Sequence, residues 1–269
     1  MCPNCRAFIT SKDKVCPYCD QPVGPRAVER RDPSPILGLI PHAAFLTMLI
    51  LVINLGLYIA TVLFSMKSGN QGAFMGIDGR TLFDFGAKHR DAILLGHWWR
   101  LITAGFLHGG LIHFAFNSWV LLDLGAQAEE NYGPGRMIVI YFIATVLGFM
   151  ASTWWSPGLS VGASAGIFGL LGAMIALGVK QPTGTAAAMR GQYVRWAVYM
   201  LVFGLLPGLR VDNAAHIGGL VGGFATAWIA GTPYLARPLL EGFWKVAAAV
   251  CVLLTALAFL NMYLWFAAR

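Results

Sequence analysis

Residues 43–66 read AAFLTMLILVINLGLYIATVLFSM, a run without a single charged residue. A helix needs about 20 consecutive apolar residues to cross the hydrocarbon core of a bilayer, so this run predicts a transmembrane helix. Six more long apolar runs follow it, and Asp123 is the only formally charged residue in any of the seven. The further runs cover residues 111–127, 137–155, 164–179, 196–209, 214–230 and 246–266.

The composition agrees with these runs. Of the 269 residues, 57% are hydrophobic and 12% are charged, whereas about 25% are charged in ordinary soluble domains. This balance excludes a soluble fold and predicts an all-α polytopic membrane protein. The runs 164–179, 196–209 and 214–230 are short for a membrane span, but glycine-rich helices can be shorter where other helices surround them.

The distribution of basic residues predicts the orientation. The net charge is +7, and most of the 19 Lys and Arg residues fall on the cytoplasmic side if the N-terminus is inside. No basic run interleaved with aromatic residues supports a nucleic-acid partner. We therefore expect a multi-pass protein of the inner or plasma membrane of a prokaryote, with a cytoplasmic N-terminus and an outer C-terminus.

Four of the five cysteines form two C-x-x-C pairs near the N-terminus, Cys2 with Cys5 and Cys16 with Cys19. Four thiolates are the ligand set of a structural zinc site, and bound zinc would fold a segment too small for its own core. Redox chemistry is the main alternative, but no thioredoxin-like strand and helix surround the pairs. We expect a zinc ribbon over residues 1–23 and a linker over 24–42, with a cytoplasmic protein as a partner the ribbon could recruit.

Polar side chains inside the apolar runs are candidates for function, because such groups are costly at membrane depth. His113 and Asn117 lie four residues apart and so share one helix face, shortly after His108. The alternative reading is a hydrogen bond between helices, which explains many single residues of this kind.

The fourth run opens with Gly162-Ala163-Ser164-Ala165-Gly166. A lone serine here would usually bond back to its own helix. Ser164 and Phe168 share one helix face, and a stripe of small residues predicts close helix packing on another. That stripe consists of Gly162, Gly166, Gly169 and Ala173.

His216 lies in the sixth run, with Gly219 and Gly223 on the same helix face. Small residues beside the histidine would let a neighbouring helix approach, so that the ring could reach a partner. Alone it would more often be a packing histidine. A nucleophile, a base and hydrogen-bond donors in three separate runs are, however, the groups that acyl transfer requires.

These residues resemble those of the rhomboid intramembrane serine proteases, over about residues 99–230. Ala165 departs from the commonest family pattern, which has glycine directly after the nucleophile. The matching pieces are Trp99-Arg100, His108 with His113 and Asn117, Gly162-Ala163-Ser164, and Ala215-His216-Ile217-Gly218-Gly219 with Gly223.

The resemblance implies a rhomboid-like core of six transmembrane helices over residues 43–230. This core includes a long first loop over 67–110, and a loop and a seventh transmembrane helix occupy 231–269. Its site would lie below the outer membrane surface, in a cavity open to water.

The resemblance also implies roles for individual residues. Ser164 would be the nucleophile and His216 its general base, in a dyad without a third carboxylate or a catalytic cofactor. The Ser164 N–H, His113 and Asn117 would stabilise the oxyanion. His108, Gly162 and Phe168 would support the site.

The implied activity is serine endopeptidase cleavage of transmembrane segments of other proteins. A catalytically silent rhomboid-like protein that binds membrane clients is the main alternative. Such relatives typically lack the serine or the histidine, and both are present here. A small transporter is a third reading, which predicts acidic residues along a pathway instead of Asp123 alone.

Overall fold

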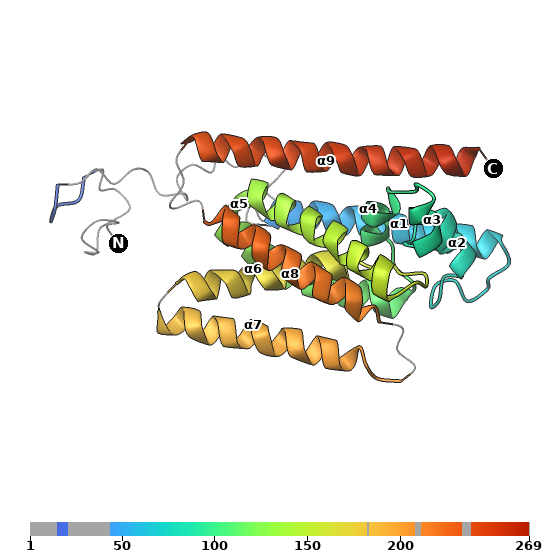
Figure 1. Ribbon diagram of the computed structural model, residues 1–269, viewed down its shortest axis with the longest axis horizontal. Helices are drawn as coiled ribbons and strands as arrows, with labels where there is room; N and C mark the ends of the chain where they lie inside the picture. Colours follow the sequence, from blue (N-terminus) through green and yellow to red (C-terminus); the bar gives the residue numbers. More distant parts are fainter. Residues whose placement is uncertain (1–14, 21–43, 182, 208–210, 233–237, 269) are drawn as a thin grey trace. The chain divides into compact units, whose positions relative to one another are not determined.

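A computed structural model of the chain describes residues 15–20, 44–181, 183–207, 211–232 and 238–268. The chain divides into two compact units, residues 1–42 and 43–269, each of which is described by itself. In the described part of the chain every regular element is a helix (Figure 1), as the composition predicts. An isolated β-bridge joins Lys88 and Ser160.

The described residues of the second unit form six longer helices and several short ones, whose arrangement is drawn in Figure 1. The first loop is folded rather than a plain connection, because it contains the short helices. The longer helices are α1 (Phe45–Lys67), α5 (Leu111–Trp155), α6 (Ser164–Lys180), α7 (Gly184–Phe203), α8 (Asn213–Ala230) and α9 (Pro238–Ala267). The short ones are α2 (Gly79–Asp84), α3 (Arg90–Leu94), α4 (Arg100–Thr103) and the 3₁₀ turn η2 (Ala104–Phe106).

The helix α5 contains the second and third predicted runs. It is interrupted at Gly133, whose φ of 73° and ψ of 164° are not helical, and Pro134 follows. Glycine adopts positive φ without steric cost, and proline lacks the N–H that a continuous helix would use. The two runs are therefore consecutive helical halves joined by a sharp break.

The limits of two other predicted runs were wrong. The fifth run, 196–209, belongs to α7, which begins at Gly184 and ends at Phe203. The Thr183 hydroxyl accepts a hydrogen bond from the Ala186 N–H at 3.2 Å and so starts the helix. The seventh run, 246–266, is also part of a longer helix, α9. Uncharged runs mark only the apolar part of a helix whose polar ends continue further.

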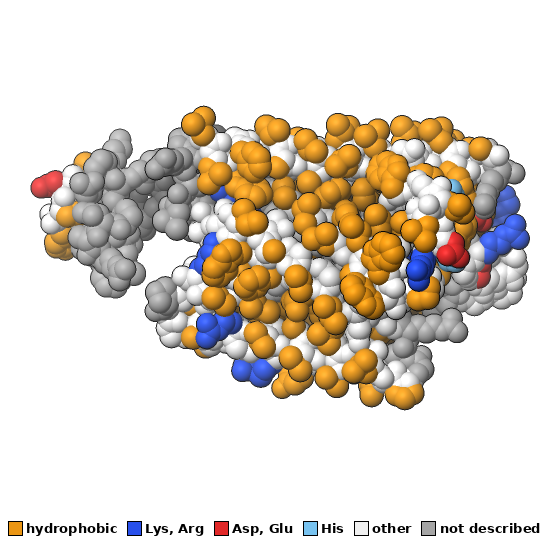
Figure 2. Space-filling view, viewed as in Figure 1, with side chains coloured by type: hydrophobic (Ala, Val, Ile, Leu, Met, Phe, Trp, Pro, Cys, Tyr) orange, Lys and Arg blue, Asp and Glu red, His pale blue; other side chains and the backbone are white. Residues whose placement is uncertain are grey.

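Three helices in the described residues are long and apolar enough to cross a membrane: α1, α5 and residues 239–267 of α9. The helix α6 is also apolar but shorter. Figure 2 shows apolar side chains over the middle of the helical body and charged ones toward the ends of the helices. This distribution fits a lipid environment, and the number of spans stays a prediction.

Two charged residues of α5 bind to the helices α1 and α9. Glu129 accepts hydrogen bonds at 3.1 Å from the backbone N–H groups of Leu46 and Thr47, which cap the first turn of α1. Arg136 is buried and pairs with both oxygens of Glu241 of α9, at 2.8 and 3.0 Å. Glu129 therefore satisfies backbone N–H groups at the start of α1, and Arg136 forms an ion pair with a residue in the first turn of α9.

The helices α6 and α8 touch through their backbones. A Cβ atom on Gly223 would lie 2.1 Å from the carbonyl oxygen of Gly169, and one on Gly172 would lie 2.2 Å from that of Leu220. Likewise, a Cβ on Gly219 would lie 2.2 Å from the Ala165 oxygen. The prediction that small residues allow close helix packing is thus confirmed for Gly169, Gly219 and Gly223.

This contact predicts a large difference between two glycine substitutions. We expect Gly223→Ala to lower the free energy of unfolding by at least about 2 kcal/mol, because the added methyl group must separate two backbones. Gly56→Ala in α1 is the matched control, since a Cβ there meets no atom within 4 Å. Unfolding of purified protein in mixed micelles, followed by circular dichroism, measures both. Equal stability of the two variants would contradict the contact.

Candidate active site

Ser164 is the first residue of α6 and is half-buried. The preceding Gly162 has a φ of 138°, a conformation that side chains disfavour, and its N–H donates to the Ala104 oxygen at 2.9 Å. Gly162 was predicted to belong to the small-residue stripe of this helix, but it lies before the helix begins. It shapes the turn that leads into Ser164.

The side chains of His113 and Ser164 both lie close to Gly162. A Cβ on Gly162 would lie 2.8 Å from His113 Nε2 and 3.4 Å from Ser164 Oγ. Nδ1 of His113 accepts a hydrogen bond from the Gly109 N–H at 3.4 Å. A neutral imidazole that accepts at one nitrogen carries its proton on the other, so Nε2–H is a donor beside the serine. Only glycine leaves room for this arrangement at position 162.

His216 is in the first turn of α8 and is 8% exposed. Its ring stacks on that of Phe168, with centroids 4.1 Å apart and planes 12° from parallel. Phe168 is one turn beyond Ser164 in α6, so the predicted shared face of these two residues points toward the histidine. No group among the described residues hydrogen-bonds to His216 Nδ1.

Asn117 and His108 both contact His113. Asn117 is buried, and its side-chain N–H donates to the His113 oxygen at 2.8 Å, which leaves its second N–H for another acceptor. His108 is completely buried, and its ring contacts those of His113 and Phe114 at centroid distances of 5.2 and 5.4 Å. His108 thus packs against the ring of His113, and its supporting role in the site stays a prediction.

Ala165, where the resemblance leads us to expect glycine, is accommodated by a glycine on a neighbouring helix. Its side chain is fully buried in a cluster with Ala104, Phe149 and Ala215. A Cβ on Gly148 of α5 would lie 2.9 Å from the Ala165 methyl carbon. The methyl group therefore occupies space between α5, α6 and α8.

Taken together, the arrangement suits acyl transfer. A hydroxyl stands at the start of a helix, a neutral imidazole N–H faces it, and a second imidazole is held in place by an aromatic ring. Attack on a carbonyl needs a nucleophile, a proton acceptor and donors for the oxyanion. The helices α5, α6 and α8 each contribute part of this set.

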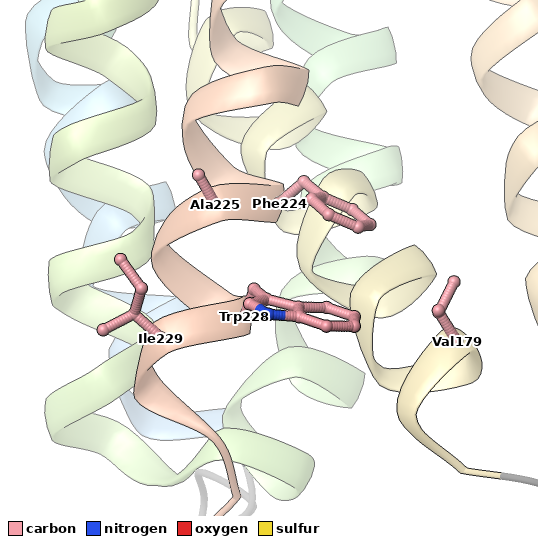
Figure 3. Close-up of a pocket in the computed structure, with 5 residues that line it drawn as sticks. All are labelled: Val179, Phe224, Ala225, Trp228 and Ile229. Atoms are coloured by element: carbon pink, nitrogen blue, oxygen red, sulfur yellow. The ribbon is translucent and has the colours of Figure 1, made fainter.

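An apolar groove lies at the opposite ends of α6 and α8 (Figure 3). Val179 lines it from α6, and Phe224, Ala225, Trp228 and Ile229 line it from α8. At 1.5 Å per residue, Val179 is about 22 Å along the helix from Ser164. The groove carries no polar reactive group and is not part of the candidate active site.

Two charged residues near the site were missed by sequence reasoning. Asp212 caps α8 by accepting from the Ala215 N–H at 3.1 Å, and it also accepts from the Ser152 hydroxyl. Lys88 of the first loop is completely buried against the segment before Ser164. An Asp ahead of an apolar run is a recognisable helix-start signal, whereas a single lysine in a long loop resembles a solvent-exposed charge.

The predicted zinc ligands are described only in part. Cys2 and Cys5 lie outside the described residues. Cys16 is buried and Cys19 half-buried on one tight turn, closed by the Asp20 N–H donating to the Cys16 oxygen at 2.9 Å. Two thiols on one turn are compatible with half of a four-thiolate site, so the zinc ribbon stays a prediction.

The chain is similar to known proteins over its helical unit. The Rhomboid domain matches residues 95–233. Rhomboid protease GluP of Bacillus subtilis is 38% identical over 173 residues, which cover 63% of this chain and 34% of the relative. RHOMBOID-like protein 4 of Arabidopsis thaliana is 30% identical over 193 residues, which cover 65% of this chain and 44% of the relative.

A third relative carries a different name. Inactive RHOMBOID-like protein 8 of Arabidopsis thaliana is 30% identical over 162 residues, covering 59% of this chain and 46% of the relative. The chain thus spans about a third to a half of the length of these relatives. The domain match covers more than half of the 269 residues. The chain therefore belongs to the rhomboid family of integral membrane proteins.

Proposed function

We propose that the protein is an intramembrane serine endopeptidase that cleaves transmembrane segments of other membrane proteins. This proposal is supported by the position of three polar residues near one end of the helical bundle: His113 of α5, Ser164 of α6 and His216 of α8. Ser164 and His113 border the same point at Gly162, and His216 stacks one turn beyond the serine. The protease name of the Bacillus relative supports the same activity.

The mechanism follows from the roles of these groups. Ser164 Oγ attacks the peptide carbonyl while His216 takes the hydroxyl proton, which requires a neutral imidazole. The negative oxygen that forms is stabilised by His113 Nε2–H, the free Asn117 N–H and the Ser164 backbone N–H. His216 then protonates the leaving amine, and a water molecule hydrolyses the acyl-enzyme by the reverse sequence. No cofactor takes part.

The substrate of this site is a locally unwound transmembrane segment. A regular helix engages its own peptide carbonyls in hydrogen bonds, so a scissile carbonyl must first leave the helix. The lipid bilayer brings such segments to the protein, and nucleic acid has no part in the proposal. A cytoplasmic N-terminus and an outer C-terminus complete the proposed topology, with residues 24–42 linking a zinc ribbon to the core.

A catalytically silent client-binding protein is the second candidate, because one relative carries the name inactive. Both the serine and the histidine are present in this chain. His216 is also held by a stacked aromatic ring. A protein that only binds clients would not need these groups, and we therefore favour the protease.

The first test removes the nucleophile and the base. We expect purified protein to cleave a reporter transmembrane segment and Ser164→Ala to abolish cleavage with unchanged helicity. A fluorophosphonate should label wild-type protein and not His216→Ala, because only a base makes the hydroxyl reactive. Cleavage assays in liposomes and gel fluorescence provide the measurements. Equal cleavage by wild type and Ser164→Ala would exclude Ser164 as the nucleophile.

A second test examines the turn before the nucleophile. Gly162→Ala should lower fluorophosphonate labelling of Ser164 by about 100-fold or more, because its methyl group displaces His113, a proposed oxyanion donor. Gly158→Ala in the same segment is the control, since a Cβ there meets no atom within 4 Å. Labelling rates of the two variants that differ by less than threefold would contradict the oxyanion role.

A third test concerns the zinc ribbon. Protein purified without chelators should contain about one zinc ion per chain by elemental analysis, because four thiolates complete a tetrahedral site. Replacing Cys2, Cys5, Cys16 and Cys19 together by serine should remove the metal, while Cys251→Ser should retain it. Wild-type protein without zinc would overturn the structural-metal proposal and leave the protease proposal untouched.

A further inference from the structure

Lys88, between α2 and α3, is one of the largest fully buried side chains in the described residues. Lysine is almost never fully buried unless its charge has partners. Its ammonium group donates to the carbonyl oxygen of Ser156, and to that of Gly158 at 3.1 Å. Both acceptors belong to residues 156–163, which lead from α5 to Ser164.

The backbone of Lys88 holds the same segment. The Lys88 N–H donates to the Ser160 oxygen at 3.0 Å, and the Ser160 N–H donates to the Lys88 oxygen at 3.1 Å. One residue of the first loop thus makes four hydrogen bonds to residues 156–160. The next anchor is the bond from the Gly162 N–H to the Ala104 oxygen. The turn that presents Ser164 is therefore fixed by the first loop at several points.

The charges around Lys88 also reach the helix of the proposed base. Burial lowers the pKa of Lys88, the carboxylate of Asp212 opposes this shift, and the positive charge of Arg90 adds to it. Residues 156–163 contribute no titratable group. Asp212 is the cap of α8, four residues before His216. Lys88 thus holds the segment of the nucleophile and interacts electrostatically with Asp212 at the start of the helix of the base.

We propose that Lys88 is a positioning residue, whose buried ammonium group holds residues 156–163 in the shape that presents Ser164 to His113 and His216. This inference rests on the proposed function. Lys88 does not touch the reacting atoms, and it acts through two backbone carbonyls. Removing the ammonium group frees those carbonyls and lets the turn before Ser164 move. A displacement of about 1 Å at a nucleophile can cost about 100-fold in rate.

The experiment compares Lys88→Met and Lys88→Arg with Lys67→Met, an exposed lysine at the end of α1. Lys88→Met should lower kcat for the reporter and the labelling rate of Ser164 by about tenfold or more, with KM changed less than about twofold. Lys88→Arg should recover much of both, because a guanidinium group can also donate to two carbonyls. Lys67→Met should match wild type.

The pH profile separates positioning from mere stability. Because burial lowers the pKa of Lys88, wild-type labelling should fall on the alkaline side below the ordinary lysine range. Arginine stays protonated throughout, so Lys88→Arg should move this alkaline limb to higher pH. An identical limb in wild type and Lys88→Arg would overturn the proposal, as would a Lys88→Met protein that labels at the wild-type rate.

Hydrogen–deuterium exchange tests the same point without activity. The amides of Ser160 and Gly162 should exchange faster in Lys88→Met than in wild type and Lys67→Met, and near the wild-type rate in Lys88→Arg. Unchanged exchange in Lys88→Met would overturn the proposal even if no cleavage is found. If Lys88→Met does not fold, the pH limb of Lys88→Arg decides. Cleavage by Ser164→Ala would instead count against the proposed function.

Discussion

The backbone contact between α6 and α8 determines the geometry on which the candidate site depends. Lipid tails are as apolar as the helix surfaces, so close packing replaces the hydrophobic effect as the force between helices in a bilayer. Glycines on both helices permit this packing, with Gly223 against Gly169 as the tightest example. The same crossing brings together the first turns of both helices, which carry Ser164 and His216. The stack of His216 on Phe168 is therefore a consequence of the crossing.

The first loop also supports this site, because it binds the segment that precedes Ser164. Arg100 is completely buried and donates to the carbonyl oxygens of Phe83 and Ala87 at 2.7 and 2.8 Å. Its guanidinium carbon lies 4.0 Å from the ring centre of Phe83 and 4.9 Å from that of Trp265 in α9. The last helix thus contacts the loop that also anchors the turn before the nucleophile. The attraction between a cation and aromatic rings adds to the hydrogen bonds by which Arg100 holds the loop.

The sequence predicted the helical class and the polar residues that meet at the site, because uncharged runs and isolated polar groups are both visible in a single chain. It did not predict the break at Gly133, the start of α7 at Gly184 or the place of Gly162 before its helix. These depend on caps and on backbone conformation rather than on hydropathy. Lys88 and Glu129 were missed for a related reason. A charge whose partner is a distant backbone group looks like a surface charge until the fold is known.

A buried site in a bundle of apolar helices favours groups that are neutral before the reaction begins. Isolated charges are expensive in such surroundings, whereas a hydroxyl, an amide and a neutral imidazole need only hydrogen bonds. Those bonds are present, since Asn117 donates to the His113 oxygen and His113 accepts from Gly109. The charged groups Lys88 and Asp212 lie at the ends of segments, where carbonyls and N–H groups surround them. A serine–histidine pair creates charge only during the reaction, when the donors are already in place, and this is why a mostly uncharged bundle can hold it.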